Sequence, residues 1–240
     1  MMTAPSTRDA RIADAILRAY DDADVTPPTI LHKSRVVPLQ LLLAGQGLNP
    51  SEHPSLKRRE AAAYLSQQLP YDVEIAGDPD DELSGYLFAN RTAGWILVDR
   101  RDPIARRRYT VAHELGHHLL HARPRLEAGD AEFSELQPKS TNIPSDDAPF
   151  GAGGEVQVVT RDDALERGTA TWEAEANQFA AALLMPADLC QALAEQFGPR
   201  CGNRRAVLAK RLAGELLVSQ EAMTYRLVAL GIGQTLEPAR

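Results

Sequence analysis

The segment YTVAHELGHHLLH, residues 109–121, separates into an apolar and a titratable face when it is drawn as an α-helix. Valine, alanine, leucine and glycine lie on one face, whereas four histidines and Glu114 lie on the other. His113 and His117 are four residues apart, so their rings leave the same face one turn from each other and can share one metal ion. Glu114 lies beside them, where a carboxylate can accept the proton of a metal-activated water. The segment therefore predicts a catalytic metal site on a helix.

The composition places the chain among ordinary globular proteins. Of its 240 residues, 44% are hydrophobic and 25% are charged, which is enough apolar material for a sizeable core. A net charge of −7 argues against nucleic acid as the main partner, because phosphate binding needs a basic surface. The amphipathic, acidic N-terminus has no apolar run long enough for export or membrane insertion. We therefore expect a cytoplasmic protein in which Cys190 and Cys201 are reduced thiols rather than zinc ligands.

The first 70 residues are expected to form an N-terminal helical segment. Apolar residues recur at helical spacing from Thr7 to Tyr20. A short apolar run from Leu39 to Leu43 predicts a second helix, and a third is predicted from Ser55 to Leu69. The two histidines of this segment have no partner at helical spacing, so neither is expected to bind a metal.

After the N-terminal segment the pattern changes to a period of two, which favours strands. Alternation from Tyr71 to Ile75 predicts one strand, and the runs Gly85–Asn90 and Trp95–Asp99 predict a hairpin around a short turn. Asp102 and Pro103 then provide a helix cap followed by a proline at the first helical position. A small antiparallel sheet is thus expected to lead directly into the metal helix.

Pro124 is expected to end that helix. The next stretch, Arg125–Thr169, is poor in large apolar residues and carries several Gly, Ser, Asp and Pro, which is typical of a flexible loop with a functional role. A further helix is predicted from Trp172 to Met185. The expected organisation is a core over residues 71–187, which contains the loop, and a helical segment over residues 188–240, all in one compact unit.

A hydrolytic zinc site needs a third protein ligand and one open position. His121 lies about two turns, or ~12 Å, from His113 along a straight helix, so it cannot complete the site. Glu173 and Glu175 are the candidates on the next predicted helix, and they point to nearly opposite sides of it. Periodicity alone leaves this choice open. Alanines near Glu173 permit a close approach of two helices, and Asn177 could hold a ligand by a hydrogen bond, so Glu173 is favoured and Glu175 is the alternative.

Two motifs together carry a family resemblance. TVAHELGHHLLH at residues 110–121, followed by EAEANQFAAALLMP at residues 173–186, resembles the ImmA/IrrE family of HExxH metallopeptidases. The hairpin end WILVDRRD and the C-terminal pattern LAKRLAGELLVSQEAMTYRLVALG resemble that family as well. The resemblance implies an α+β, zincin-like fold, in which a small antiparallel sheet packs on a helical bundle and C-terminal helices follow. It also carries the third zinc ligand, a Glu four residues before an Asn, onto Glu173.

The function that the resemblance implies is zinc-dependent cleavage of a protein. His113, His117 and Glu173 would bind the zinc ion (Zn²⁺), while Glu114 would act as the general base. Relatives often cut a helix-turn-helix repressor that controls stress, phage or mobile-element genes, so such a repressor is the expected partner. The gap of 56 positions between His117 and Glu173 is long for the family, and the N-terminal segment has no counterpart in it. Both departures from the family pattern concern the choice of substrate more than the binding of the metal.

An alternative function is a regulator that binds a repressor or DNA without cutting it. Arg204–Gly214 and Gln220–Leu230 are predicted helices joined by a short turn, which is helix-turn-helix spacing, and basic side chains accompany them. Such helix pairs are more often packing units, so direct nucleic-acid binding is not expected. A purely structural zinc site is disfavoured, because no Cys or His is available for a fourth position. If the protein cuts peptides, Tyr225 and His118 are the candidate groups for stabilising the oxyanion.

Overall fold

A hairpin of β2 (Leu83–Asn90) and β3 (Gly94–Asp99) forms the middle of a four-stranded sheet in the computed structural model, which describes residues 6–138, 161–201 and 204–233. The two strands are antiparallel, and nearly all of their residues are buried. The Asn90 side chain closes the turn by accepting hydrogen bonds from the backbone N–H groups of Thr92 (2.9 Å) and Ala93 (3.0 Å). The hairpin predicted from the sequence is thereby confirmed.

Two further strands make the sheet mixed, in the order β1-β3-β2-β4. β1 (Leu48–His53) pairs parallel with β3, and β4 (Glu132–Pro138) pairs antiparallel with β2. Periodicity does not reveal β1, because an edge strand pairs on one side only and tolerates the polar and proline residues of LNPSEH. The strand expected at Tyr71–Ile75 is wrong. Those residues have no regular structure, and the alternation reflects Val73 and Ile75, which pack partly buried against the core beneath the sheet.

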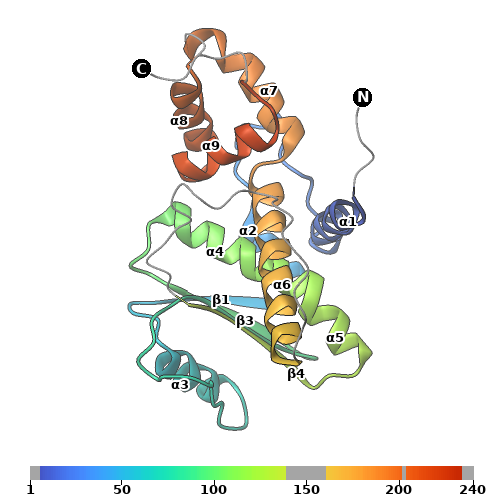
Figure 1. Cartoon of the computed structure of the whole chain (residues 1–240), viewed down its shortest axis with the longest axis vertical. Helices are drawn as coiled ribbons and strands as arrows, with labels where there is room; N and C mark the ends of the chain where they lie inside the picture. Colours follow the sequence, from blue (N-terminus) through green and yellow to red (C-terminus); the bar gives the residue numbers. More distant parts are fainter. Residues whose placement is uncertain (1–5, 139–160, 202–203, 234–240) are drawn as a thin grey trace.

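Helices cover both faces of the sheet (Figure 1). α3 (Arg58–Gln68) lies on one face, whereas α4 (Ile104–His117) and α6 (Arg161–Leu184) lie on the other. Successive residues of β2 alternate between two hydrophobic cores, because neighbouring side chains of a strand point to opposite faces. Tyr86 packs in the core on the α3 side, and Leu87 packs in the larger core with α4 and α6.

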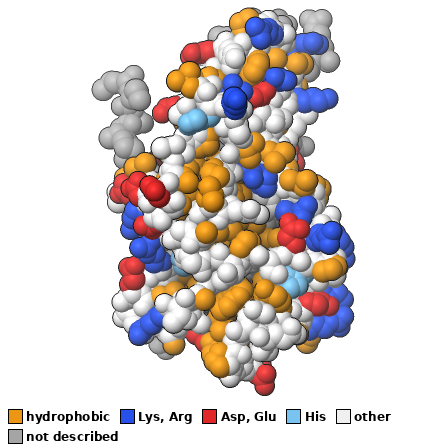
Figure 2. Space-filling model, turned by 180° about the vertical axis from the view of Figure 1, so that it is seen from behind, with side chains coloured by type: hydrophobic (Ala, Val, Ile, Leu, Met, Phe, Trp, Pro, Cys, Tyr) orange, Lys and Arg blue, Asp and Glu red, His pale blue; other side chains and the backbone are white. Residues whose placement is uncertain are grey.

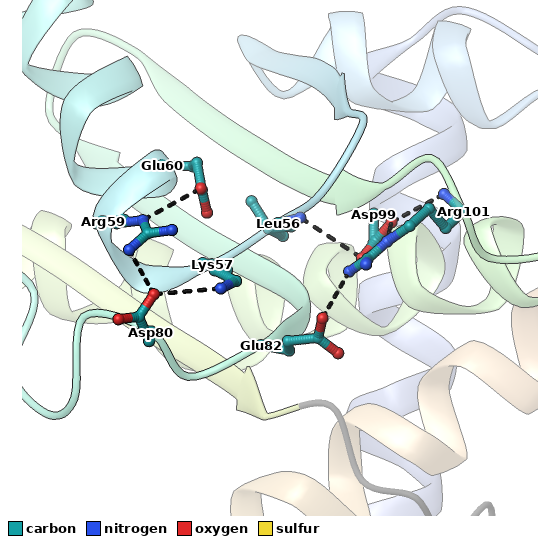
Figure 3. A network of polar contacts seen from close by, with 8 residues as sticks. All are labelled: Leu56, Lys57, Arg59, Glu60, Asp80, Glu82, Asp99 and Arg101. Atoms are coloured by element: carbon teal, nitrogen blue, oxygen red, sulfur yellow. Dashed lines mark hydrogen bonds and ion pairs between the residues drawn. The ribbon is translucent and has the colours of Figure 1, made fainter.

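A polar network holds the segment before α3 to the end of β3 (Figure 3). Asp99, which is fully buried, accepts hydrogen bonds from the Leu56 backbone N–H (3.5 Å) and from the Arg101 guanidinium (2.7 Å). The same guanidinium donates to Glu82 (3.0 Å), and two basic residues at the start of α3 pair with Asp80. A buried carboxylate is stable only when its charge is matched, so this network has a structural role and fixes α3 beneath the sheet.

The helix that begins with α4 does not end at Pro124. A π-helical turn, η1 (His118–Ala122), connects it directly to α5 (Arg123–Ala128). Pro124 stands in the first turn of α5, after the π-helical turn has already shifted the hydrogen-bond pattern, so its missing N–H is tolerated there. The prediction that Pro124 ends the helix is therefore wrong.

The prediction of a loop over residues 125–169 is wrong at both ends of that range. α5 and β4 occupy the first part, and the first turns of α6 occupy the last part. Hydrogen bonding to the edge of β2 orders β4, and composition does not register such long-range pairing. Residues 139–160, the rest of the expected flexible loop, lie outside the described residues.

The remaining helices come from the N-terminal and C-terminal parts of the sequence. α1 (Thr7–Asp22), which is capped by Ser6, packs along α6, and α2 (Leu39–Gly45) packs on β1. The C-terminal elements lie together at the end of the molecule away from α3 (Figure 1): α7 (Ala187–Phe197), the 3-10 turn η2 (Pro199–Cys201), α8 (Arg205–Leu216) and α9 (Gln220–Ala229). The helices predicted from the sequence are confirmed with shifted ends, and both cysteines are free and buried.

The α+β, zincin-like architecture expected from the sequence is confirmed, with a mixed sheet in place of a wholly antiparallel one. Within the part of the chain that the structure describes, no helix has the length and apolar character needed to cross a membrane.

Candidate metal centre

α4 and α6 lie close together because the side chains between them are small. A Cβ atom added at Gly116 would lie 3.2 Å from the Ala176 Cα atom and 3.0 Å from the Phe179 Cδ1 atom. Ala180 and Ala181 extend the small-residue surface of α6 and are also buried. In a close-packed interior even one added methyl group must displace its neighbours, so glycine at position 116 sets the spacing that brings polar side chains of both helices together.

Three side chains from these two helices converge on one point. His113 and His117 come from α4 and are 0% exposed, whereas Glu173 comes from α6 with a side chain that is 34% exposed. The two histidine Nε2 atoms are 2.9 Å apart. The Glu173 carboxylate oxygens lie 3.3 Å from His113 Nε2 and 3.2 Å from His117 Nε2. The structure thus brings together the three residues that the sequence singled out as metal ligands.

The spacing of these atoms suits a tetrahedral metal ion. Zinc bonds of ~2.0–2.1 Å to nitrogen or oxygen place neighbouring ligand atoms about 3.3 Å apart in a tetrahedron. The three distances between ligand atoms run from 2.9 to 3.3 Å, and the possible ligand atoms of the three residues all lie within 4.8 Å of one another. One ion could therefore contact all three residues after small side-chain adjustments, with the exposed Glu173 side left open.

Hydrogen bonding fixes the orientation of the His113 ring. Its Nδ1 atom lies 3.1 Å from Asn177 Oδ1, which can only accept, so Nδ1 carries the proton and donates it. In the neutral ring the Nε2 atom then presents its lone pair to His117 and Glu173. A lone pair that faces a carboxylate is repelled unless a cation lies between them. This arrangement of donors and acceptors fits a metal ion, and Asn177 makes the kind of contact that was expected of it.

The protonation states of His117 and Glu173 agree with metal binding. Burial lowers the pKa of His117 and so favours its neutral ring, although the Glu173 carboxylate opposes this effect. Burial alone would raise the pKa of Glu173, but the neighbouring His113 and His117 outweigh it and hold that pKa below its usual range, so the carboxylate is ionised. Neutral imidazole and ionised carboxylate are the forms in which these side chains bind metals.

Glu175, the alternative ligand, faces away from these histidines. Its carboxylate pairs with Arg11 and Arg8 of α1 and lies 3.7 Å from His121 Nε2. His121 in turn stacks on Trp172, with ring centroids 4.8 Å apart and planes 13° from parallel. We call Glu175, Arg8, Arg11 and His121 the Glu175 cluster. The cluster therefore contains His121, which helix geometry excluded as a ligand, and Glu175, the alternative to Glu173.

The other predicted residues lie in different surroundings. Glu114, the expected general base, follows His113 on α4 and is fully buried. His118 is buried too, and it borders a polar pocket beside the β2–β3 turn together with Asn90 and Arg123. Tyr225 lies partly buried on α9, in the C-terminal group of helices. The oxyanion-stabilising role of His118 or Tyr225 stays a prediction.

Sequence reasoning missed Tyr109. Its hydroxyl oxygen lies 2.9 Å from Asn177 Oδ1, the atom that also accepts the His113 hydrogen bond. Tyr109 is four residues before His113, which places both side chains on one face of α4. That spacing is the signal that could have identified it.

Comparison with known families identifies part of the chain. Residues 68–143 match the family model Peptidase M78, described as the IrrE N-terminal-like domain. The match confirms the family resemblance of the hairpin and of the segment that carries the two histidines. It includes the hairpin and both histidines of α4 and ends before Glu173, so the placement of Glu173 at the site comes from the geometry. No curated protein sequence is similar enough to count as a match.

Proposed function

Because the chain carries an IrrE N-terminal-like domain and is a metallopeptidase, we propose that it is a zinc-dependent endopeptidase. The metal ion would be bound by His113, His117 and Glu173. The observation that carries this proposal is the convergence of two histidine nitrogens and one carboxylate within 2.9 to 3.3 Å. Zinc is the ion that best suits a tetrahedral site of two imidazoles and a carboxylate with one open position.

The proposed mechanism assigns a task to each residue. A bound zinc ion supplies Lewis-acid activation of a water molecule and of the scissile carbonyl. Glu114 takes the proton of the attacking water and delivers it to the nitrogen of the leaving amine. Asn177 keeps the His113 ring in place, and the ionised Glu173 offsets part of the positive charge. Since the two histidines are fully buried, the substrate approaches from the partly exposed Glu173 side.

The substrate of a peptidase is a protein, and the finer proposal is that it is a helix-turn-helix transcriptional repressor of a stress, phage or mobile-element circuit. Support comes from the resemblance to ImmA/IrrE proteins, whose substrates are often such repressors. The net charge of −7 complements a basic DNA-binding substrate. On the face shown in Figure 2, acidic and basic side chains are interspersed, a surface that fits a protein partner better than a phosphate backbone.

Co-expression with each repressor encoded near the gene tests this proposal. A zinc-dependent cut in one of them is the expected result. The matched control is Glu114→Gln, which keeps the shape of the side chain but cannot accept the proton. Its cleavage rate should fall about 10²- to 10⁴-fold, while its zinc content stays near one ion per chain. Cleavage by Glu114→Gln at the wild-type rate would exclude Glu114 as the base.

The alternative function, a non-catalytic regulator that binds a repressor or DNA through its C-terminal helices, has less support. α8 and α9 do have the spacing of a helix-turn-helix, with Ser219 capping α9. Two of their basic side chains, however, contact the protein itself. Arg226 donates to the Met185 carbonyl oxygen (2.9 Å), and Arg211 pairs with Glu215 on the same helix. A helix whose arginine is used in this way has less charge to offer to phosphates.

A further inference from the structure

Tyr109 lies at the end of a short chain of hydrogen bonds that leads to the metal centre. It stands on α4 one turn before His113, and its hydroxyl oxygen lies 2.9 Å from the Asn177 Oδ1 atom. The same Oδ1 atom lies 3.1 Å from His113 Nδ1. One amide oxygen of α6 therefore accepts hydrogen bonds from two side chains of α4.

The protons of these two hydrogen bonds have one arrangement that is compatible with metal binding by His113. An amide oxygen only accepts, so the Tyr109 hydroxyl and the His113 Nδ1–H both donate to it. Burial, together with the Glu173 charge, raises the pKa of Tyr109 to about 12, so the hydroxyl keeps this proton at neutral pH. The lone pair of His113 Nε2 then faces His117 and Glu173.

The orientation of the His113 ring depends on these hydrogen bonds. Among the described residues, the Nδ1 atom of His117 has no hydrogen-bond partner, so His113 is the ring of the pair that a hydrogen bond fixes. Asn177 is only partly buried, and its amide would rotate more freely if one of its two donors were removed. Such outer residues set ligand orientation and tune metal affinity.

We propose that Tyr109 is a positioning residue of the metal centre. Through Asn177 it holds the His113 ring in the orientation in which Nε2 binds the ion. The proposal rests on the proposed function, since it requires that His113, His117 and Glu173 bind zinc.

Tyr109→Phe removes the hydroxyl alone and keeps the ring in the core. Its zinc affinity should fall about 10-fold, at the low end of the range for residues that orient a metal ligand. Asn177→Ala should cost as much or more. The double variant should bind zinc no more weakly than Asn177→Ala, because Tyr109 acts through Asn177. Additive losses in this double-mutant cycle would contradict the proposal.

Tyr20→Phe is the matched control, because the Tyr20 hydroxyl is also buried and has no hydrogen-bond partner among the described residues. Its zinc affinity should equal that of the wild type. A nitrogen NMR spectrum of the zinc-loaded protein adds a second readout. Hydrogen exchange at His113 Nδ1 should be faster in Tyr109→Phe than in Tyr20→Phe.

The zinc titration separates the two proposals. A wild type that binds no zinc would overturn the proposed function, and the role of Tyr109 with it. A wild type that binds zinc tightly, alongside a Tyr109→Phe variant of equal affinity and equal exchange rate, would overturn the role of Tyr109 alone.

Discussion

Glu173 and Glu175 stand two residues apart on α6, yet they lie in opposite environments. The Glu173 side chain is 34% exposed and faces two histidine nitrogens. The Glu175 side chain is 8% exposed and pairs with Arg8 and Arg11 of α1. The more buried of the two carboxylates is therefore the one whose charge the protein itself compensates.

This difference shows that burial does not identify a functional carboxylate, whereas the chemistry of the facing atoms does. Arginine brings its own positive charge, so the Glu175 cluster is electrostatically complete. Neutral imidazoles bring lone pairs, so the Glu173 side needs a cation to become complete. The two carboxylates should accordingly respond to substitution in different measurements.

Glu173→Ala should produce the largest effect, a near-complete loss of bound zinc from about one ion per chain, because the site loses one of three protein ligands. Glu175→Ala should keep its zinc. Metal analysis of the two purified variants checks this expectation. Loss of zinc from Glu175→Ala alone would show that Glu175 is the third ligand. It would also refute the observed orientation of α6, in which Glu173 faces the two histidines.

Removal of the metal should lower stability wherever the site is intact. Free zinc at about 1,000 times its Kd adds about 4 kcal/mol to the free energy of unfolding. A chelator should remove this contribution from the wild type and from Glu175→Ala. Thermal unfolding of Glu173→Ala should be insensitive to the chelator. A chelator effect of equal size in all three proteins would place the metal elsewhere.

Gly116→Ala tests whether the helix spacing builds the site. The new Cβ atom would lie 3.2 Å from the Ala176 Cα atom, which can move only with its helix. The free energy of unfolding should fall by about 1–3 kcal/mol, and zinc affinity should fall as α4 and α6 separate. Denaturant unfolding and zinc titration measure the two effects.

Gly214→Ala is the matched control for Gly116→Ala, because a Cβ atom at position 214 on α8 would meet nothing within 4 Å. Alanine should stabilise that helix by about 0.5–1 kcal/mol and leave zinc affinity unchanged. If both glycine variants behaved alike, the close approach at Gly116 would have no bearing on the site.

Glu175→Ala should reduce stability modestly. Loss of a carboxylate from a wholly buried ion pair costs about 3–5 kcal/mol, but Arg8 and Arg11 are about half exposed and can regain water, so we expect about 1–2 kcal/mol. Denaturant unfolding of the metal-free proteins measures this change. Glu127→Ala, which breaks an exposed pair with Arg123, is the control and should change stability by less than about 0.5 kcal/mol.

The sequence predicts the parts of this molecule whose signal is local. The two faces of the segment 109–121, the hairpin turn and the Ala-rich helix are all visible as periodicity or turn chemistry. β1 and β4 are not, because the edge of a neighbouring strand orders them and their own alternation is weak. The end of the helix at Pro124 was mispredicted because a π-helical turn accommodates the proline.

The site shows the same limit. Spacing alone leaves Glu173 and Glu175 as equal choices, and only the packing of α6 on α4 and α1 separates them. The ion pairs of Glu175 with Arg8 and Arg11 join residues more than 160 positions apart, so no local sequence pattern could predict them. Tyr109 is local to His113, but its role depends on an amide that another helix supplies.

The most direct test of the central claim is anomalous X-ray diffraction at the zinc absorption edge from crystals of the zinc-loaded protein. The account predicts one peak per chain at ~2.0–2.2 Å from His113 Nε2, His117 Nε2 and a Glu173 carboxylate oxygen. A zinc peak at the Glu175 cluster, or no zinc peak between α4 and α6, would contradict it.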